Sequence, residues 1–348
     1  MVGRREQGFV LASTVWLTTI LLILGAVFHS YVQARVEQAI RLQGHGRAEF
    51  DLYSTGQSVR YLLLTRHLTR AGLSSGARHP SSLVGADGFA VREPFGDEIR
   101  VDGTAYSGIG CARYRIQDRS GLVALNAEGT DRLLAQGFSW RLSEPAMGSL
   151  SAALADYRDR DSERRLGGAE ISDYRRLGMQ APRDSYLRSD RELAAVMGWA
   201  DWLAQAPERS AWFDIGNGAA FNLNASPPGL LALLLGVGPD EAQELVDTRT
   251  REPFESLDQV SAALNRLNHW KEERFRFTAG RGFRVELWCN AGNRIRVRGI
   301  QLTPQGIDGP AQTDYYYRAS RSGDDGYVEE SPSGARALFT DTLPADSG

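Results

Sequence analysis

The sequence has little cysteine, few histidines and almost no net charge, and each shortage narrows the possible functions. Its 348 residues include two cysteines, Cys111 and Cys289, too few for a four-ligand structural zinc site. They are either two unpaired thiols or, in an oxidising compartment, one disulfide. The five histidines form no H-E-x-x-H pair, and no Walker loop or Rossmann fingerprint occurs. A formal net charge of -3 gives no basic footprint for nucleic acid.

One G-x-S-x-G motif occurs, at Gly72–Gly76. A nucleophile elbow needs a strand before its serine and a helix after it. Here the pattern predicts a helix before the motif and a loop after it, so we interpret the match as chance and predict no enzyme. A membrane-tethered hydrolase that uses Ser74 stays an alternative hypothesis.

Charged residues are also absent from Phe9 to Ala34, a run of 26 residues. About 20 helical residues span 30 Å, the thickness of the hydrocarbon core of a bilayer. Arg4 and Arg5 precede the run, and the positive-inside rule therefore places the N-terminus in the cytoplasm. We predict a single membrane-spanning helix over 9–34. The run is too long for an ordinary signal peptide, but a plain signal anchor stays an alternative.

The same helix is predicted to continue as an amphipathic segment over 35–71. Apolar and aromatic side chains recur there in steps of three or four, which predicts one stripe that packs on a globular head. The stripe, with one polar member, is Phe50, Tyr53, Gln57, Tyr61, Leu64 and Leu68. We expect the helix to run from Phe9 to about Thr69, loosened at Gly44 and Gly46 and ended by the loop at 72–76.

Strand-like runs flank a helical block. Period-two patterns and apolar runs predict strands at 89–91, 98–101, 112–117 and 122–125, and again at 283–289, 294–302 and 314–318. The sequence therefore predicts an α+β fold, in which an all-helical insertion interrupts an antiparallel sheet. The expected parts are a leader at 1–8, the helix at 9–34 and 35–71, the sheet at 72–126 and 268–319, the insertion at 127–267, and a polar tail at 320–348 that we expect to be disordered.

The start of the apolar run resembles the processing site of type IV prepilins. A short basic leader ends at Gly8, and the run begins at once with Phe9. The resemblance implies that a prepilin peptidase cuts after Gly8 and that Phe9 becomes an N-methylated N-terminus. Most pilin-like subunits carry glutamate at the fifth mature position, where this chain has Ser13. A glutamate in lipid is costly and needs a partner. The absence of this glutamate therefore suits a subunit that has no other subunit above it in the filament.

Further motifs resemble the K-type minor pseudopilins of type II secretion systems, the pilin-like members that typically lack that glutamate. The segment DYRDRDSERRLGGAEISDY, at 156–174, is similar to the family pattern D-W-x-D-x-D followed by G-A-E and a tyrosine, with Tyr157 in place of tryptophan. Other stretches resemble further family segments in order and spacing: 120–133, 188–198 and 221–257. With the N-terminus, the resemblance covers most of residues 8–302.

This resemblance implies a fold and a role. The fold would be type IV pilin-like, with the long helix packed on the sheet. The chain would be a single-pass protein of the cell inner membrane with its globular domain in the periplasm. It would join the I- and J-type minor pseudopilins at the pseudopilus tip, and promote filament initiation and protein secretion. Its other partners would be the prepilin peptidase and the secretion assembly platform. A minor pilin of a type IV pilus is the alternative.

An acidic loop lies within the 156–174 motif. Asp159, Asp161, Glu163 and Glu170 occupy the first, third, fifth and twelfth places of an EF-hand-like spacing, and hard oxygen ligands suit calcium. The sixth place holds Arg164 where an EF-hand needs glycine, so the loop is not an EF-hand. The family resemblance implies a structural calcium ion, for which we predict Asp159, Asp161 and Glu170 as ligands. A solvated acidic loop with helix caps is the alternative.

The segment from Asn222 to Arg249 resembles a helix-hairpin-helix, with Gly236-Val237-Gly238 as its turn. In DNA-binding proteins of this kind the hairpin amides hold a phosphate. Here Asp240 and Glu241 follow the turn, and two carboxylates at a helix N-terminus repel phosphate. We therefore interpret the segment as a packing module and predict no nucleic-acid partner. A membrane-tethered DNA-binding protein stays an alternative hypothesis.

Overall fold

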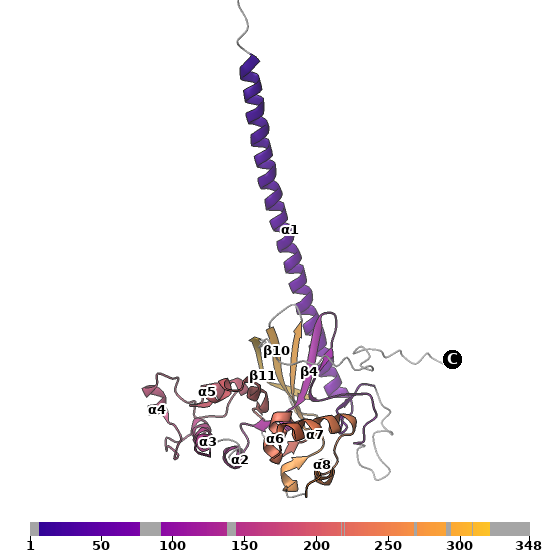
Figure 1. The fold of residues 1–348 in the computed structure, drawn as a ribbon, viewed down its shortest axis with the longest axis vertical. Helices are drawn as coiled ribbons and strands as arrows, with labels where there is room; N and C mark the ends of the chain where they lie inside the picture. Colours follow the sequence, from indigo (N-terminus) through magenta and orange to yellow (C-terminus); the bar gives the residue numbers. More distant parts are fainter. Residues whose placement is uncertain are drawn as a thin grey trace, which may run out of the picture.

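A computed structural model describes residues 7–76, 92–137, 144–216, 218, 220–267, 270–289, 294–307 and 309–320. Figure 1 shows one long helix that rises from a head made of a sheet and a helical block. Most of the expected leader at 1–8, the expected strand at 89–91 and nearly all of the tail at 320–348 lie outside the described residues.

The long helix, α1 (Gln7–Thr65), is continuous through 59 residues. It is the one helix in the described part of the chain that is long and apolar enough to cross a membrane, and its most apolar stretch has no side chain buried against the head. It ends at Thr65 instead of Thr69, and Gly44 and Gly46 do not interrupt it. A glycine costs a helix only about 1 kcal/mol, too little to break a long cooperative run.

The prediction of which α1 face packs on the head is wrong. Phe50 and Tyr53 of the predicted stripe are 67% and 60% exposed. The buried face lies beside that stripe and is lined by small or aliphatic side chains: Leu52, Thr55, Gly56, Val59, Leu62 and Leu63. Small residues let the sheet come close, since a Cβ at Gly56 would lie 3.0 Å from Leu287 Cδ1.

The sheet that packs on α1 has five antiparallel strands in the order β11-β10-β9-β4-β3. They are β3 (Asp102–Ser107), β4 (Ala112–Asp118), β9 (Gly282–Cys289), β10 (Arg294–Leu302) and β11 (Ala311–Ser320). A two-residue pair, β1 (Leu73–Ser74) and β2 (Glu98–Ile99), lies apart. Alternate side chains such as Tyr114, Ile116 and Val285 form one core with α1. The α+β fold with its long helix on an antiparallel sheet is thereby confirmed.

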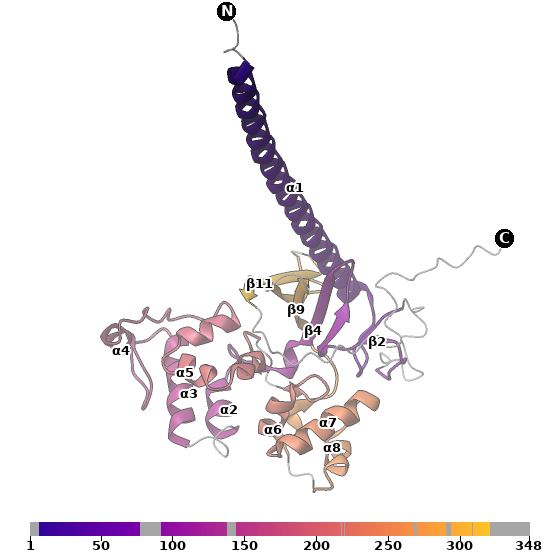
Figure 2. The same cartoon turned by 45° about the horizontal axis from the view of Figure 1, so that its top comes forward.

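The helical block connects β4 to β9 and has a separate core. Its α-helices are α2 (Thr130–Gly137), α3 (Glu144–Arg158), α4 (Ile171–Arg176), α5 (Trp199–Ala204), α6 (Pro228–Leu235), α7 (Pro239–Arg251) and α8 (Leu257–Ala263). Its 3-10 helices are η2 (Arg119–Gly121), η3 (Asp190–Ala195), η4 (Pro207–Trp212) and η5 (Glu272–Arg274). Figure 2 shows α2 to α5 on one side of the sheet and α6 to α8 beneath it.

The block is longer than the predicted insertion at 127–267. The predicted strand at 122–125 contains β5 (Val123–Ala124), which pairs with β6 (Phe213–Asp214) of the block and not with the large sheet. Likewise β7 (Phe221–Asn222) pairs with β8 (Phe275–Arg276). The insertion therefore extends from the end of β4 to the start of β9, because these short strands pair within it.

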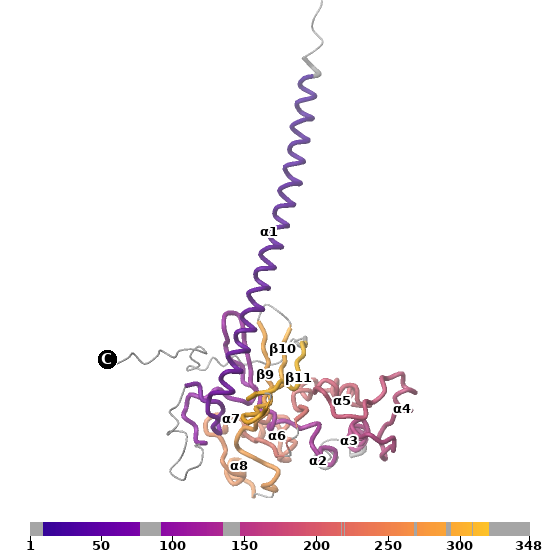
Figure 3. Tube along the Cα trace, turned by 180° about the vertical axis from the view of Figure 1, so that it is seen from behind, coloured from indigo at the N-terminus to yellow at the C-terminus, as the bar shows by residue number. Residues whose placement is uncertain are grey.

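Buried ion pairs fasten the block to the sheet. Asp214 of the block is fully buried and accepts hydrogen bonds from Arg119 Nε (2.5 Å) and from Arg284 Nη2 of β9 (3.0 Å). Tyr315 of β11 donates its hydroxyl to the same carboxylate (2.5 Å). Arg284 also pairs with Asp190 of η3, at 3.2 Å. Viewed from behind in Figure 3, the α2 to α5 part of the block extends sideways from the sheet.

The two cysteines lie at the ends of neighbouring strands. Cys111 precedes β4 and Cys289 ends β9, where Cys289 is opposite Ala112 in the strand register. The structure joins them in a disulfide with a Cα–Cα distance of 5.2 Å. The segment between the two cysteines consists of β4, the helical block and β9. The disulfide therefore closes the loop that carries the block.

Candidate functional site

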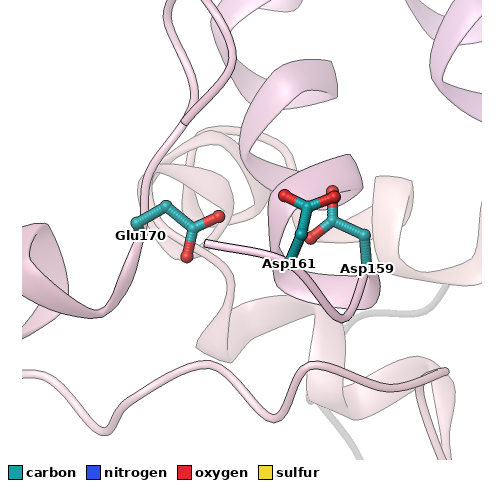
Figure 4. Close-up of side chains that lie close together, drawn as sticks. All are labelled: Asp159, Asp161 and Glu170. Atoms are coloured by element: carbon teal, nitrogen blue, oxygen red, sulfur yellow. The ribbon is translucent and has the colours of Figure 1, made fainter. Parts of the chain in front are cut away.

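Three carboxylates meet where the chain leaves α3 and enters α4. Asp159 directly follows α3, Asp161 lies in the next turn, and Glu170 precedes α4. One ligand atom from each lies within 4.8 Å of the others. Figure 4 shows the three side chains directed toward a shared space. The structure thus brings together the three residues that the sequence predicts as calcium ligands, while Glu163, the other acidic residue of the predicted spacing, is exposed and not part of this group.

The loop folds around a fourth carboxylate, that of Asp156 on α3. Asp156 is fully buried and accepts hydrogen bonds from the Arg165 amide (3.2 Å) and from Arg165 Nη1 (2.7 Å). Gly168 packs so closely that a Cβ there would overlap the Asp156 carboxylate. Gly167 has a φ of +78°, which favours glycine. The G-G pair of the motif is therefore required by the turn that returns the chain to Glu170.

The carboxylates of this loop are short of positive partners. Burial raises the pKa of Glu170, and the charges of Asp156, Asp159 and Asp184 raise it further. Among the buried side-chain atoms that the structure describes, Asp159 Oδ1 and Glu170 Oε1 have no hydrogen-bond partner. Glu170 itself is only 6% exposed. An unpartnered buried carboxylate is unfavourable, and a hard cation with oxygen ligands such as calcium would satisfy it.

Three residues of this site were not predicted from the sequence. Asp156 was matched to the family motif but not to the acidic cluster, and Asp184 lies too far along the chain to be grouped by spacing. Arg165 is not a metal ligand, so ligand spacing gives it no role, yet its guanidinium contacts both Asp156 and Asp159. The D-x-x-D spacing from Asp156 to Asp159 is the sequence signal that could have extended the cluster.

The predicted processing junction lies at the start of α1. Gly8 and Phe9 fall within the first helical residues, where the apolar run begins. Ser13, at the position where pilin-like subunits usually carry glutamate, donates its hydroxyl to the Val10 carbonyl (2.9 Å). It thereby satisfies its own polar group within the helix and needs no partner from another chain.

The G-x-S-x-G match does not form a nucleophile elbow. Ser74 lies in the two-residue strand β1, its side chain is fully buried, and its hydroxyl donates to the Gly76 carbonyl (3.4 Å). An elbow instead presents its serine at an exposed strand-to-helix turn. The surroundings of Ser74 therefore do not fit a hydrolase nucleophile.

The helix-hairpin-helix segment is formed by α6 and α7. The Gly238 amide at the N-terminus of α7 donates to Glu241 Oε2 (2.7 Å). Arg266 Nη2 binds the other oxygen of the same carboxylate (2.6 Å). In a DNA-binding hairpin this amide would donate to a phosphate. Here it donates to the carboxylate of Glu241 instead.

A long N-terminal helix whose first, apolar part is free and whose last part packs on an antiparallel sheet is the architecture of type IV pilin-like proteins. No protein-family model matches the chain. The chain is similar to type II secretion system protein K of Pseudomonas aeruginosa, with 26% identity over 325 residues, which cover 85% of this chain and 89% of that protein. This similarity confirms the resemblance to the K-type minor pseudopilins that the motifs indicate.

Among solved structures, the chain is similar to one in the crystal structure of the GspK-GspI-GspJ complex from the enterotoxigenic Escherichia coli type 2 secretion system. The TM-score is 0.42 at 14% sequence identity. The match covers 60% of this chain and 80% of that chain.

Proposed function

We propose that this chain is an inner-membrane minor pseudopilin that caps the tip of a type II secretion pseudopilus and promotes its initiation, and thereby protein secretion. The observation that carries the proposal is the helical block, which projects to one side of the axis of α1 (Figure 2). In a helical filament each head lies over its neighbours. A head widened in this way leaves no room for another subunit above it, so it belongs at an end.

The predicted membrane-spanning part of α1 is suited to insertion into the bilayer and to later extraction from it into the filament. A helix without charged groups crosses lipid at low cost and can pack against similar helices outside it. We propose that the prepilin peptidase cuts after Gly8, that Phe9 is N-methylated, and that the head lies in the periplasm. The mass of the mature N-terminus tests this: with the peptidase it should begin at methylated Phe9, and retention of residues 1–8 would contradict it.

The free face of α1 is the proposed contact surface for the I- and J-type minor pseudopilins and, during assembly, the secretion platform. Phe50, Tyr53 and Tyr61 are more than half exposed at the level of the head, outside the predicted membrane segment. Aromatic side chains of this kind are enriched at protein interfaces. Tyr53→Arg should abolish co-purification of the I- and J-type subunits. Tyr186→Arg, at a 67% exposed tyrosine of the helical block, is the matched control and should leave it intact.

The tip position can be tested by removing the block. Asp118 at the end of β4 lies directly opposite Phe283 of β9, so an Asn-Gly turn can replace residues 119–282 and close a two-residue hairpin. Immunogold labelling should find the intact chain only at filament ends and the shortened chain along the shaft. Intact chain spread evenly along filaments would refute the tip role.

We further propose that Asp159, Asp161 and Glu170 hold a structural calcium ion, supported by the two buried, unpartnered oxygens of the cluster. The ion would neutralise a loop that has little apolar burial of its own. Calcium should raise the melting temperature of the chain, and Glu170→Gln should abolish the rise. Glu163→Gln, in the same loop but outside the cluster, is the control and should leave it unchanged.

The type IV pilus alternative predicts the same architecture and a different phenotype. Deleting the gene should block secretion of exoproteins if the chain belongs to a secretion system. Loss of pili with normal secretion would favour the alternative.

A further inference from the structure

One arginine borders the candidate calcium site and contacts one of its three carboxylates. Arg165 Nη1 donates to Asp156 Oδ1 at 2.7 Å and also contacts Asp159 Oδ2. Its backbone amide donates to the second Asp156 oxygen at 3.2 Å. The same side chain is 46% exposed, whereas its partner Asp156 is fully buried. One guanidinium nitrogen of Arg165 thus lies between two carboxylates. The rest of the side chain is partly exposed to solvent.

The two oxygens of Asp159 have different surroundings. Oδ2 contacts Arg165, while Oδ1 is buried and has no hydrogen-bond partner in the described residues. Glu170 Oε1 is also buried and has no hydrogen-bond partner in the described residues. Asp159 therefore connects the arginine to the unsatisfied part of the cluster.

A calcium ion at this cluster would compete with the guanidinium. Calcium binds carboxylate oxygens at about 2.3–2.6 Å and often takes both oxygens of one carboxylate. A guanidinium bonded to that carboxylate would then be within a few ångströms of a divalent cation, where like charges repel strongly. Asp156 lies deeper, is held by the Arg165 amide and is covered by Gly168, so the arginine can keep Asp156 while it releases Asp159.

We propose that Arg165 is a built-in counter-ion of the calcium loop, which bridges Asp156 and Asp159 in the calcium-free chain and gives up Asp159 when calcium binds. This inference rests on the proposed calcium site. The arginine keeps the loop folded without the ion, and it sets the calcium affinity lower than the carboxylates alone would give. The loop is then ordered in both states, and the ion adds stability to a fold that already exists.

Arg165→Gln tests the role, with Arg164→Gln as the matched control. Arg164 is the preceding residue, is 58% exposed and pairs with Asp173 of α4, at 3.4 Å, outside the cluster. The full chain in detergent is titrated with calcium chloride by isothermal calorimetry, and its melting temperature is measured with EDTA and with excess calcium. The calorimetric and thermal readouts together separate a counter-ion from a residue that only supports the loop.

We expect Arg165→Gln to bind calcium up to about fivefold more tightly than the intact chain, the effect of one partly exposed ion pair. Its melting temperature should fall in EDTA and return toward that of the intact chain with calcium. Arg165→Lys, which keeps the charge, should have an intermediate affinity. Arg164→Gln should match the intact chain in affinity.

Two results would overturn the inference, and they differ. If the intact chain binds calcium and Arg165→Gln binds it equally or more weakly, the arginine supports the bound loop and the counter-ion role is wrong. If neither the intact chain nor any variant binds calcium, the calcium site itself is wrong and the inference fails with it. Binding by Arg165→Gln alone would support the counter-ion role in its strongest form.

Discussion

Replacing Arg284 with methionine tests how the helical block is held to the sheet. The guanidinium of Arg284 is 5% exposed, and it donates to Asp214 from Nη2 (3.0 Å) and Nε (3.2 Å) and pairs with Asp190 (3.2 Å). Methionine keeps the unbranched aliphatic part of the side chain but removes the guanidinium and its charge. Removing one partner of a buried ion pair typically lowers the free energy of unfolding by about 3–5 kcal/mol, because it leaves a buried charge uncompensated.

The two carboxylates are affected unequally. Asp214 keeps Arg119 Nε and the Tyr315 hydroxyl, each at 2.5 Å. Asp190 keeps the Tyr317 hydroxyl (2.9 Å), and burial already raises its pKa. Loss of the arginine should raise that pKa further. A group with a raised folded-state pKa lowers stability as the pH rises through that pKa, so the deficit should be largest at pH 7 and shrink as the pH falls.

Urea unfolding of the chain in detergent, followed by tryptophan fluorescence at pH 7 and pH 5, measures both effects. Arg298→Met is the control, because this guanidinium lies over the ring of Tyr316 on the sheet, away from the block. It should lower the free energy of unfolding by only about 0.5–1 kcal/mol. Adding Asp190→Asn to Arg284→Met should recover part of the loss. If Arg284→Met lowers the free energy of unfolding by no more than the control does, this network does not hold the block to the sheet.

Three further predictions concern the sheet and its helix. Replacing both cysteines with serine should lower the free energy of unfolding by about 2–5 kcal/mol relative to the oxidised intact chain in urea titrations, and the reduced intact chain, as the control, should show the same loss. Burial opposes a low pKa for Asp102, but Arg100 and Arg249 lower it, so Asp102→Asn should be destabilising at pH 7 and progressively less so below pH 3.8. Leu62→Ala should cost about 2–5 kcal/mol and Tyr61→Ala less than about 1, and the reverse order would contradict the observed α1 face.

The sequence predicted the parts of the fold that have long or strictly periodic patterns. An uncharged run of 26 residues from Phe9 has few structural solutions, and α1 contains it. The strands predicted at 112–117, 283–289 and 294–302 correspond to β4, β9 and β10. Alternation is clear in β4 and β9, because one face packs on α1 through residues such as Ile116 and Val285, and the other carries the Arg115–Glu286 ion pair.

The errors arose where spacing alone does not determine a partner. Two stripes on α1 have helical spacing, and spacing predicted the aromatic one, although the sheet packs on small residues such as Thr55 and Gly56. A two-residue strand such as β5 has no periodicity, so its pairing within the block could not be predicted. The acidic loop was predicted from ligand spacing, but the position of Arg165 depends on the turn at Gly167 and Gly168, which brings the chain back over Asp156.

The disulfide between Cys111 and Cys289 covalently joins the two ends of the segment that contains the helical block. A protease that cut a surface loop of the block would leave two fragments that stay covalently joined, with β4 and β9 still side by side. Such a nick would be seen on a gel only after reduction. A subunit damaged there could therefore keep its sheet and its helix, and with them its place among its neighbours.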